Sequence, residues 1–144
     1  MAAIDFLRAW AGIVAPARES HRPLTEAELR RLDGGVVEVG AHSVTHPSLA
    51  TLSAEEQRYE VRHSKAWLEA ALGRTVATFA YPFGDRSPAA ASLVREAGFE
   101  AACTTEAAPV EPGRDLFELP RVAVGDWSGA EFARRWEAGF PERL

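Results

Sequence analysis

The fold of this chain is decided by residues 36–47, which read VVEVGAHSVTHP. The β-branched residues of the first half, bounded by glycines, predict a short buried strand over residues 36–40. Two histidines follow at once, His42 and His46, four residues apart. Pro47 disfavours helical geometry at His46, so the pair belongs to a loop or a single turn. The stretch therefore predicts a strand that ends in a polar loop.

Strands and helices are predicted to alternate on the C-terminal side of this stretch. Four strands are expected, over residues 36–40, 76–81, 99–104 and 119–124. Helix starts are expected at Thr25, Ser53, Ser87 and Ser128, where a hydroxyl can cap the first turn. Strands that alternate with helices imply parallel β/α units, whose sites lie in the loops at the carboxyl ends of the strands.

Size, charge and cysteine content narrow the class of protein. The chain has 144 residues, with 16 basic and 21 acidic side chains and a formal charge of −5. Without a basic block, a nucleic-acid partner is not expected. Cys103 is the single cysteine, so no intrachain disulfide can form. A complete β/α barrel usually needs roughly 250 residues, so this length does not easily close one.

The N-terminal residues leave the compartment open. The apolar run over residues 9–17 is too short to span a membrane. It has a faint similarity to a signal peptide, against which Asp5 argues. We expect instead a short amphipathic helix whose apolar face carries Phe6, Trp10 and Ile13 or Val14.

The histidine pair is the first candidate for chemistry. Two neutral imidazoles at the end of a strand can bind one divalent ion such as zinc, although catalytic zinc normally has a third protein ligand. The pattern differs from that of zinc peptidases, because Ser43 follows His42 where their glutamate would be. The alternative is a pair of loop histidines that cap backbone groups. Spacing and position leave both interpretations open.

Three further segments are weaker candidates. The turn over residues 79–85, FAYPFGD, could present a backbone N–H to an oxyanion, although a plain strand-ending turn with core aromatics is the simpler interpretation. Arg121 could place a guanidinium near the end of the sheet, or be a surface residue. Trp127 could line a sugar site, or be a buried loop aromatic. His63 is expected on a helix surface and His21 in a loop.

Taken together and in this order, residues 42–47, 79–84 and 119–122 resemble the polysaccharide deacetylase family, metal-dependent hydrolases that remove N- or O-acetyl groups from sugars. The resemblance extends from about residue 24 to residue 132. It implies an α/β fold, a partial (β/α) barrel that lacks its N-terminal strands. Residues 36–144 would be the C-terminal part of such a domain, and residues 1–35 a helical lead-in, the end of an insertion.

The resemblance also implies roles for individual residues. His42 and His46 would be ligands of a divalent metal, most simply zinc, that activates water. The backbone N–H of Phe83 would stabilise the oxyanion. Tyr81 and Trp127 would contact the carbohydrate. Arg121 would replace the arginine that the family often has at the position of Ala80.

The chain also departs from the family pattern. The family's catalytic base and third metal ligand are two adjacent aspartates, and no such pair occurs in this sequence. The late histidine that serves as general acid has no counterpart after His63. We therefore expect a deacetylase portion that is inactive alone and that needs an upstream segment or self-association to cover an open barrel. The alternative is a non-catalytic module that binds sugar or metal, or packs against another protein.

Overall fold

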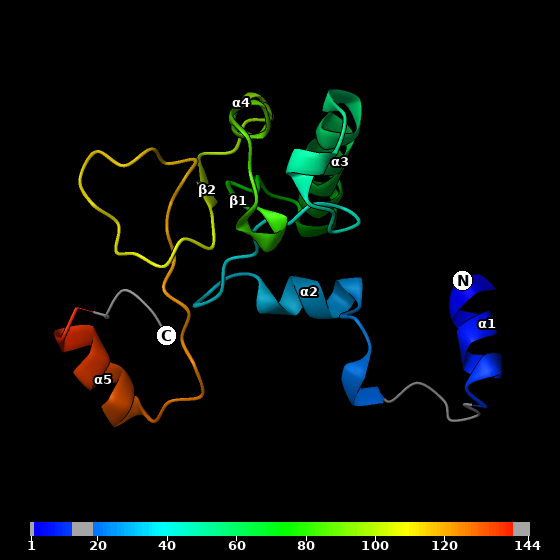
Figure 1. The fold of residues 1–144 in the computed structure, drawn as a ribbon, viewed down its shortest axis with the longest axis horizontal. Coiled ribbons are helices and arrows are strands. Elements are labelled where there is room, and N and C mark those ends of the chain that lie inside the picture. Colours follow the sequence, from blue (N-terminus) through cyan, green and yellow to red (C-terminus); the bar gives the residue numbers. More distant parts are fainter. Residues whose placement is uncertain (1, 13–18, 140–144) are drawn as a thin grey trace.

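A small parallel sheet lies at the centre of the computed structural model, which describes residues 2–12 and 19–139. Strands β1 (Thr78–Ala80) and β2 (Ala101–Cys103) pair in parallel, with Phe79 opposite Ala102. Single parallel bridges extend the sheet on both sides, from Ala41 to Phe79 and from Cys103 to Leu119. Four segments thus run side by side in chain order, which confirms the predicted parallel α/β arrangement (Figure 1).

The first predicted strand, residues 36–40, is wrong in its position and its burial. Pairing begins only at Ala41, whose N–H donates to the Thr78 carbonyl at 2.9 Å and whose carbonyl accepts from Ala80 N–H at 2.8 Å. Val36 is fully exposed, at 104%. The β-branched residues favour extended backbone, but a strand also needs a neighbour to pair with and pack against. Among the residues described, residues 36–40 pair with no strand, and Gly40 only approaches Thr78.

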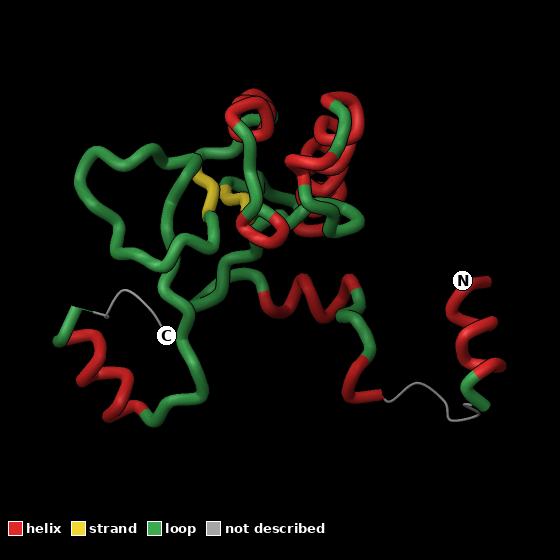
Figure 2. Tube along the Cα trace, in the orientation of Figure 1, coloured by secondary structure: helices red, strands yellow, loops and turns green. Residues whose placement is uncertain are grey.

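The fourth predicted strand, residues 119–124, shrinks to one bridging residue. The Leu119 carbonyl accepts from Thr104 N–H at 2.8 Å. Pro120 then has no N–H to continue the ladder. The N–H of Arg121 donates to the Glu106 carbonyl at 2.8 Å, and Val124 is exposed. Apolar residues in this segment therefore do not make a strand. Figure 2 shows that the chain between β2 and the last helix is loop.

The described residues form five helices, and four of them, all except α1, begin where the capping residues predict. They are α1 (Ala2–Trp10), α2 (Glu26–Leu32), α3 (Ala54–Leu72), α4 (Pro88–Glu96) and α5 (Gly129–Glu137). Single 3-10 turns span Glu19–His21, Leu49–Thr51 and Pro82–Gly84. Both predicted capping boxes are present, Thr25 with Glu28 and Ser53 with Glu56. In each box the hydroxyl and the carboxylate satisfy end-of-helix N–H groups reciprocally.

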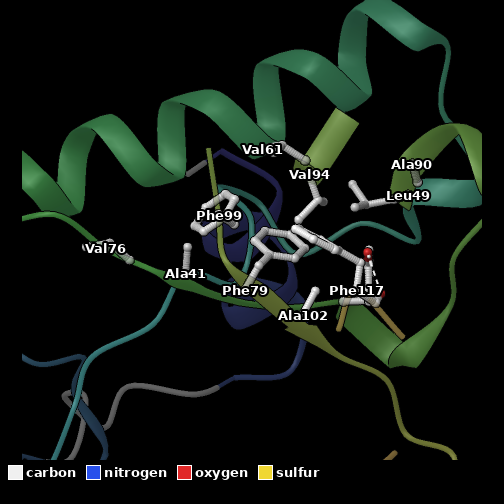
Figure 3. Packing of buried hydrophobic residues seen from close by; sticks show 11 residues of the cluster. Ala41, Leu49, Val61, Val76, Phe79, Ala90, Val94, Phe99, Ala102 and Phe117 are labelled. Carbon is white, nitrogen blue, oxygen red and sulfur yellow. Dashed lines mark hydrogen bonds between the residues drawn. The ribbon is translucent and has the colours of Figure 1, made fainter. Parts of the chain in front are cut away.

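The core lies between the sheet and helices α3 and α4 (Figures 1 and 3). Phe79 points into it, with its ring 5.4 Å from that of Tyr81 and 5.3 Å from that of Phe99. Val61 of α3 and Val94 of α4 close over these rings and are fully buried. The opposite face of the sheet is only half-buried; it carries Thr78, Ala80, Ala101 and Cys103. Helices cover one face of the sheet and leave the other open.

The N-terminal helices contribute little to this core. Helix α1 lies apart from the strands in Figure 1, and its Phe6 and Trp10 are exposed. Ile13 and Val14, predicted for the same face, lie outside the described residues. Helix α2 packs against α3, and Arg74 Nε donates to Asp33 just beyond α2 at 2.7 Å. No helix within residues 2–12 and 19–139 is long and apolar enough to cross a membrane.

Candidate metal site

His42 is oriented by the main chain of the neighbouring strand. Its Nδ1 lies 2.7 Å from the carbonyl oxygen of Ala80, the last residue of β1. Since a carbonyl oxygen only accepts hydrogen bonds, Nδ1 carries the proton and donates it. In the neutral ring the lone pair then sits on Nε2. Metal-binding histidines commonly have this arrangement, in which the other ring N–H is held by a carbonyl or carboxylate.

His46 returns to the side of His42 through a tight loop. The two imidazole rings lie edge to face, with centroids 4.7 Å apart and planes at 72°. The His46 N–H donates to Ser43 Oγ at 3.0 Å, which closes the loop. On its other side the His46 ring meets the Phe83 ring, also at 4.7 Å. The structure thus brings His42, His46 and Phe83 together from two loops that are 37 residues apart in sequence.

Backbone strain is concentrated at this site. In residues 2–12 and 19–139, the non-glycine residues with positive φ are Ser43 (65°), His46 (60°) and Phe83 (60°). Each left-handed residue costs roughly 1–2 kcal/mol relative to the right-handed region. Such conformations persist where surrounding contacts over-determine them, and they cluster at functional sites. Their placement on both loops beside the histidines marks this part of the molecule as the candidate site.

The buried carboxylate of Glu60 holds the histidine loop by hydrogen bonds from helix α3. Glu60 of α3 is 6% exposed; its Oε2 accepts from the N–H groups of Val44 and Thr45 at 2.7 and 2.9 Å, and its Oε1 from Thr45 Oγ1 at 2.6 Å. Burial by itself raises the pKa of Glu60, but the hydrogen bonds from Thr45, Val44 and Ser43 outweigh it and lower the pKa below its usual value. The sequence interpretation missed Glu60. The available signal was a run of polar residues on the buried face of α3: Gln57, Glu60 and Ser64.

The turn that carries Phe83 is fixed by a close approach to the chain after β2. Gly84 has φ 71°, and a Cβ there would lie 2.1 Å from Thr105 Oγ1 and 2.5 Å from Thr105 N. Thr105 Oγ1 in turn donates to the Phe83 carbonyl at 3.1 Å. Pro82 is buried beneath the turn, whereas the Phe83 ring is 66% exposed. The Phe83 main chain is therefore held beside His46, and its role as an oxyanion donor stays a prediction.

The donor set fits part of a zinc site. Two imidazole nitrogens with an oriented tautomer are typical zinc ligands, and a catalytic zinc takes three protein ligands. Within the described ranges, 2–12 and 19–139, no three histidine, cysteine, aspartate or glutamate side chains gather closely enough to hold an ion. Asp85, just past the Phe83 turn, accepts a hydrogen bond from Ser48 Oγ instead. The residues present thus supply two ligands of such a site.

Tyr81 lies in the core, although the family resemblance predicted that its side chain would contact the carbohydrate. The side chain is fully buried, and its hydroxyl donates to the Phe117 carbonyl at 3.1 Å. Burial raises its pKa to about 12. Its ring packs edge to face on Phe79. The structure therefore corrects the prediction for this side chain: Tyr81 is buried and supports the turn from inside.

Arg121 and Trp127 follow Leu119, which bridges to the opposite edge of the β1–β2 pair from Ala41. Arg121 Nε donates to the Thr104 carbonyl at 2.8 Å, beside the bridge to Leu119. Ala41 and Leu119 are separated by three strand spacings, roughly 14 Å in a flat sheet. Trp127 is half-buried, and its ring lies 4.4 Å beneath the Arg135 guanidinium of α5. The Arg121 guanidinium is thus held at the end of β2, and the predicted roles of Arg121 and Trp127 stay predictions.

A comparison with known protein families also points to the histidine loop and the neighbouring Phe83 turn. The model of the polysaccharide deacetylase family matches residues 13–102, more than half of the chain and both loops of the candidate site. The chain belongs to the polysaccharide deacetylase family. A Bacillus subtilis (strain 168) protein assigned to these deacetylases, YxkH, is 23% identical over 110 residues. That match covers 76% of this chain and 39% of YxkH, so the chain spans about two fifths of that relative's length.

Solved structures share the fold of this deacetylase chain. The Streptococcus pyogenes deacetylase PplD, in complex with acetate, superposes with a TM-score of 0.73 at 21% identity, over 81% of this chain and 52% of PplD. IcaB from Ammonifex degensii superposes with a TM-score of 0.67 at 22% identity, over 91% of this chain and 59% of IcaB. At these identities the likeness shows a shared α/β fold, of which this chain covers about half.

Proposed function

We propose that this chain carries the metal-binding part of a hydrolase that removes acetyl groups from N- or O-acetylated carbohydrate. The observation that carries the proposal is the arrangement of His42 and His46. Their rings are 4.7 Å apart, and the Ala80 carbonyl orients one of them so that Nε2 points away from its hydrogen-bonded side. Membership of the polysaccharide deacetylase family supports the reaction class.

Each residue of the two loops has a task in this proposal. His42 and His46 would hold a divalent ion, zinc by the chemistry of imidazole donors. When bound, such an ion supplies a Lewis acid that polarises the acetyl carbonyl and makes water a stronger nucleophile. The Ala80 carbonyl keeps His42 in the tautomer that leaves Nε2 unprotonated. The Phe83 N–H, held beside His46, would donate to the carbonyl oxygen as that oxygen gains negative charge.

The chain alone is proposed to be inactive, because two parts of the machinery are missing from its sequence. No two aspartates are adjacent anywhere in the 144 residues, so the family's base and third ligand have no counterpart. Two imidazoles without a carboxylate hold zinc loosely. Without a positioned base, proton transfer from water loses a factor of roughly 10²–10⁴. A non-catalytic module that binds sugar or metal is the alternative, and the incomplete ligand set favours it for the isolated chain.

We further propose that residues 36–144 form a partial barrel, with residues 1–35 as its lead-in. Two features support this: the second face of the sheet is half-buried, and no strand among the described residues pairs with the outer edge of the Ala41 segment. Between the histidine loop and α3, a hollow of about 510 Å³ is lined in part by Val44, Tyr59 and Trp67, all substantially exposed. An upstream segment or a second copy would cover these surfaces. Light scattering of the isolated chain tests the second option, and a stable monomer would contradict it.

Metal titration tests the ligand assignment. We expect weak but measurable zinc binding by calorimetry in the wild type, and loss of that binding in His42→Ala and in His46→Ala. His63→Ala is the matched control, because His63 is an exposed histidine that stacks on Tyr59 within α3. Equal affinity in the wild type and in a variant that lacks both loop histidines would remove the metal site.

Acetate release tests the activity. Acetylated chito-oligosaccharide is incubated with the chain and zinc, and acetate is measured against His42→Ala. We expect no release by either protein. Release by the wild type that His42→Ala abolishes would support the deacetylase and contradict the incompleteness. Release that survives in His42→Ala would contradict the role of the metal ligand.

A further inference from the structure

Glu60 is a buried carboxylate whose hydrogen-bonding capacity is directed at one loop. It sits on the buried side of α3, whose other buried residues are Gln57, Val61, Ser64 and Ala71. Burial of an ionised carboxylate is costly unless its oxygens receive hydrogen bonds. Here they receive three, from two consecutive main-chain N–H groups and one hydroxyl of residues 44 and 45. These are the residues between the two histidines.

The hydrogen bonds fall on the part of the loop where the backbone needs support. Val44 and Thr45 lie between Ser43, with φ 65°, and His46, with φ 60°. The two left-handed residues would relax to ordinary backbone if the arc between them were free. Since Oε2 accepts from both N–H groups at once, it holds the two peptide units in one orientation. The conformation on either side of the arc is fixed with them.

That conformation decides where the His46 ring lies. The ring stands edge to face against His42 on one side and Phe83 on the other, both at 4.7 Å. A right-handed backbone at His46 would point its Cβ elsewhere and separate the two imidazoles. The carboxylate on α3 is thus connected to the ligand geometry through three short hydrogen bonds and one strained residue.

We propose that Glu60 is a positioning residue of the metal site: its ionised carboxylate locks residues 43–46 in the arc that brings His46 to His42, and so sets the affinity for a divalent ion. The inference rests on the proposed function for its metal, but not for its effect on the loop. Supporting residues of this kind typically change metal affinity by roughly 10–100-fold.

Three variants separate the contributions of charge, shape and packing. Glu60→Gln keeps the size and one acceptor oxygen, but its NH₂ group replaces one of the two oxygens. Glu60→Ala removes every hydrogen bond to the loop. Ser64→Ala is the matched control, because Ser64 is equally buried one turn further along α3 and donates only to the Val61 carbonyl within the helix.

Two measurements on the full chain test the proposal. Amide hydrogen exchange at Val44 and Thr45, followed by NMR without metal, reports whether the loop is held. Titration with Co²⁺, followed by its visible absorption, reports affinity and ligand geometry. We expect fast exchange and an affinity at least tenfold lower in Glu60→Ala, intermediate values in Glu60→Gln, and wild-type values in Ser64→Ala.

The outcomes distinguish this inference from the proposed function. If the wild type binds no Co²⁺, the proposed metal site fails, and the exchange rates alone decide whether Glu60 holds the loop. Wild-type Co²⁺ affinity in folded Glu60→Ala or Glu60→Gln overturns the inference while the metal site stands. An equal loss in Ser64→Ala also overturns it, since packing of α3 would then explain the effect. If Glu60→Ala does not fold, Glu60→Gln decides.

Discussion

The two sides of the β1–β2 pair are built by different physical means. On one side Ala41 leads into the histidine loop, and a buried carboxylate of α3 fastens that loop to the core. On the other side Leu119 leads into the segment that reaches Trp127 and α5, where Glu131 forms ion pairs with Arg134 and Arg135 at the helix surface. Strained backbone occurs on the first side. The loop with the proposed metal ligands is thus held by hydrogen bonds that are partly shielded from water.

The largest loss of stability is expected from a substitution in the core that supports the histidine loop. Phe79 is 2% exposed and contacts the rings of Tyr81 and Phe99, so Phe79→Ala should cost about 3–5 kcal/mol of unfolding free energy. Val36→Ala is the control, because Val36 is fully exposed, and should leave stability unchanged. Urea unfolding followed by circular dichroism measures both. Similar costs for the two variants would contradict the assigned core.

A smaller loss of stability is expected when a substitution pushes the Phe83 turn away from Thr105. Gly84→Ala combines a left-handed backbone with a Cβ that would lie 2.5 Å from Thr105 N, a main-chain atom that cannot move aside cheaply. Gly98→Ala has the same left-handed strain, with φ 80° and no atom within 4 Å. Strain alone costs about 1–2 kcal/mol. We expect Gly84→Ala to lower the melting temperature more than Gly98→Ala does. Equal losses would show that the close approach is absent.

A loss that depends on pH is expected at Glu60. Its pKa is lowered in the folded chain, so the folded chain binds fewer protons than the unfolded chain. The stabilisation is fully present above the ordinary glutamate pKa of 4.5 and disappears as the pH falls through the lower, folded value. The stability gap between wild type and Glu60→Gln should therefore be widest near neutral pH and shrink in acid. A gap that is independent of pH in urea titrations would argue against an ionised carboxylate.

The smallest effect on stability is expected on α5, at the end of the segment that follows Leu119. Glu131 accepts hydrogen bonds from Arg134 and Arg135 on the surface of α5, and these, Arg134 first, lower its pKa to about 2. Exposed ion pairs contribute little to stability because water and salt screen them. Glu131→Gln should leave the unfolding midpoint of the core unchanged in the assay used for Phe79→Ala. A clear shift would show that α5 is coupled to the core.

The local features were predictable from the sequence because their causes are local. The Ser53–Glu56 capping box and the glycine that ends α3 depend on residues within one turn of each other, and both form as predicted. The pairing of β1 with β2 follows from the alternation of strands and helices. The lengths of the outer strands were not predictable, because a strand ends where its neighbour ends, as residues 36–40 and 119–124 illustrate.

The sequence by itself determined the family, the order of the elements and the two histidines, because these depend on residue types at short spacing. Only the tertiary structure decided how the site is held. Glu60 lies 14 residues beyond His46, and the Ala80 carbonyl lies 38 residues beyond His42; neither contact has a signature at that separation. Likewise Tyr81 became a core residue because Phe79, Phe99 and the Phe117 carbonyl surround it. Contacts between distant segments form only when packing brings the segments together, and here they decide the geometry of the candidate site.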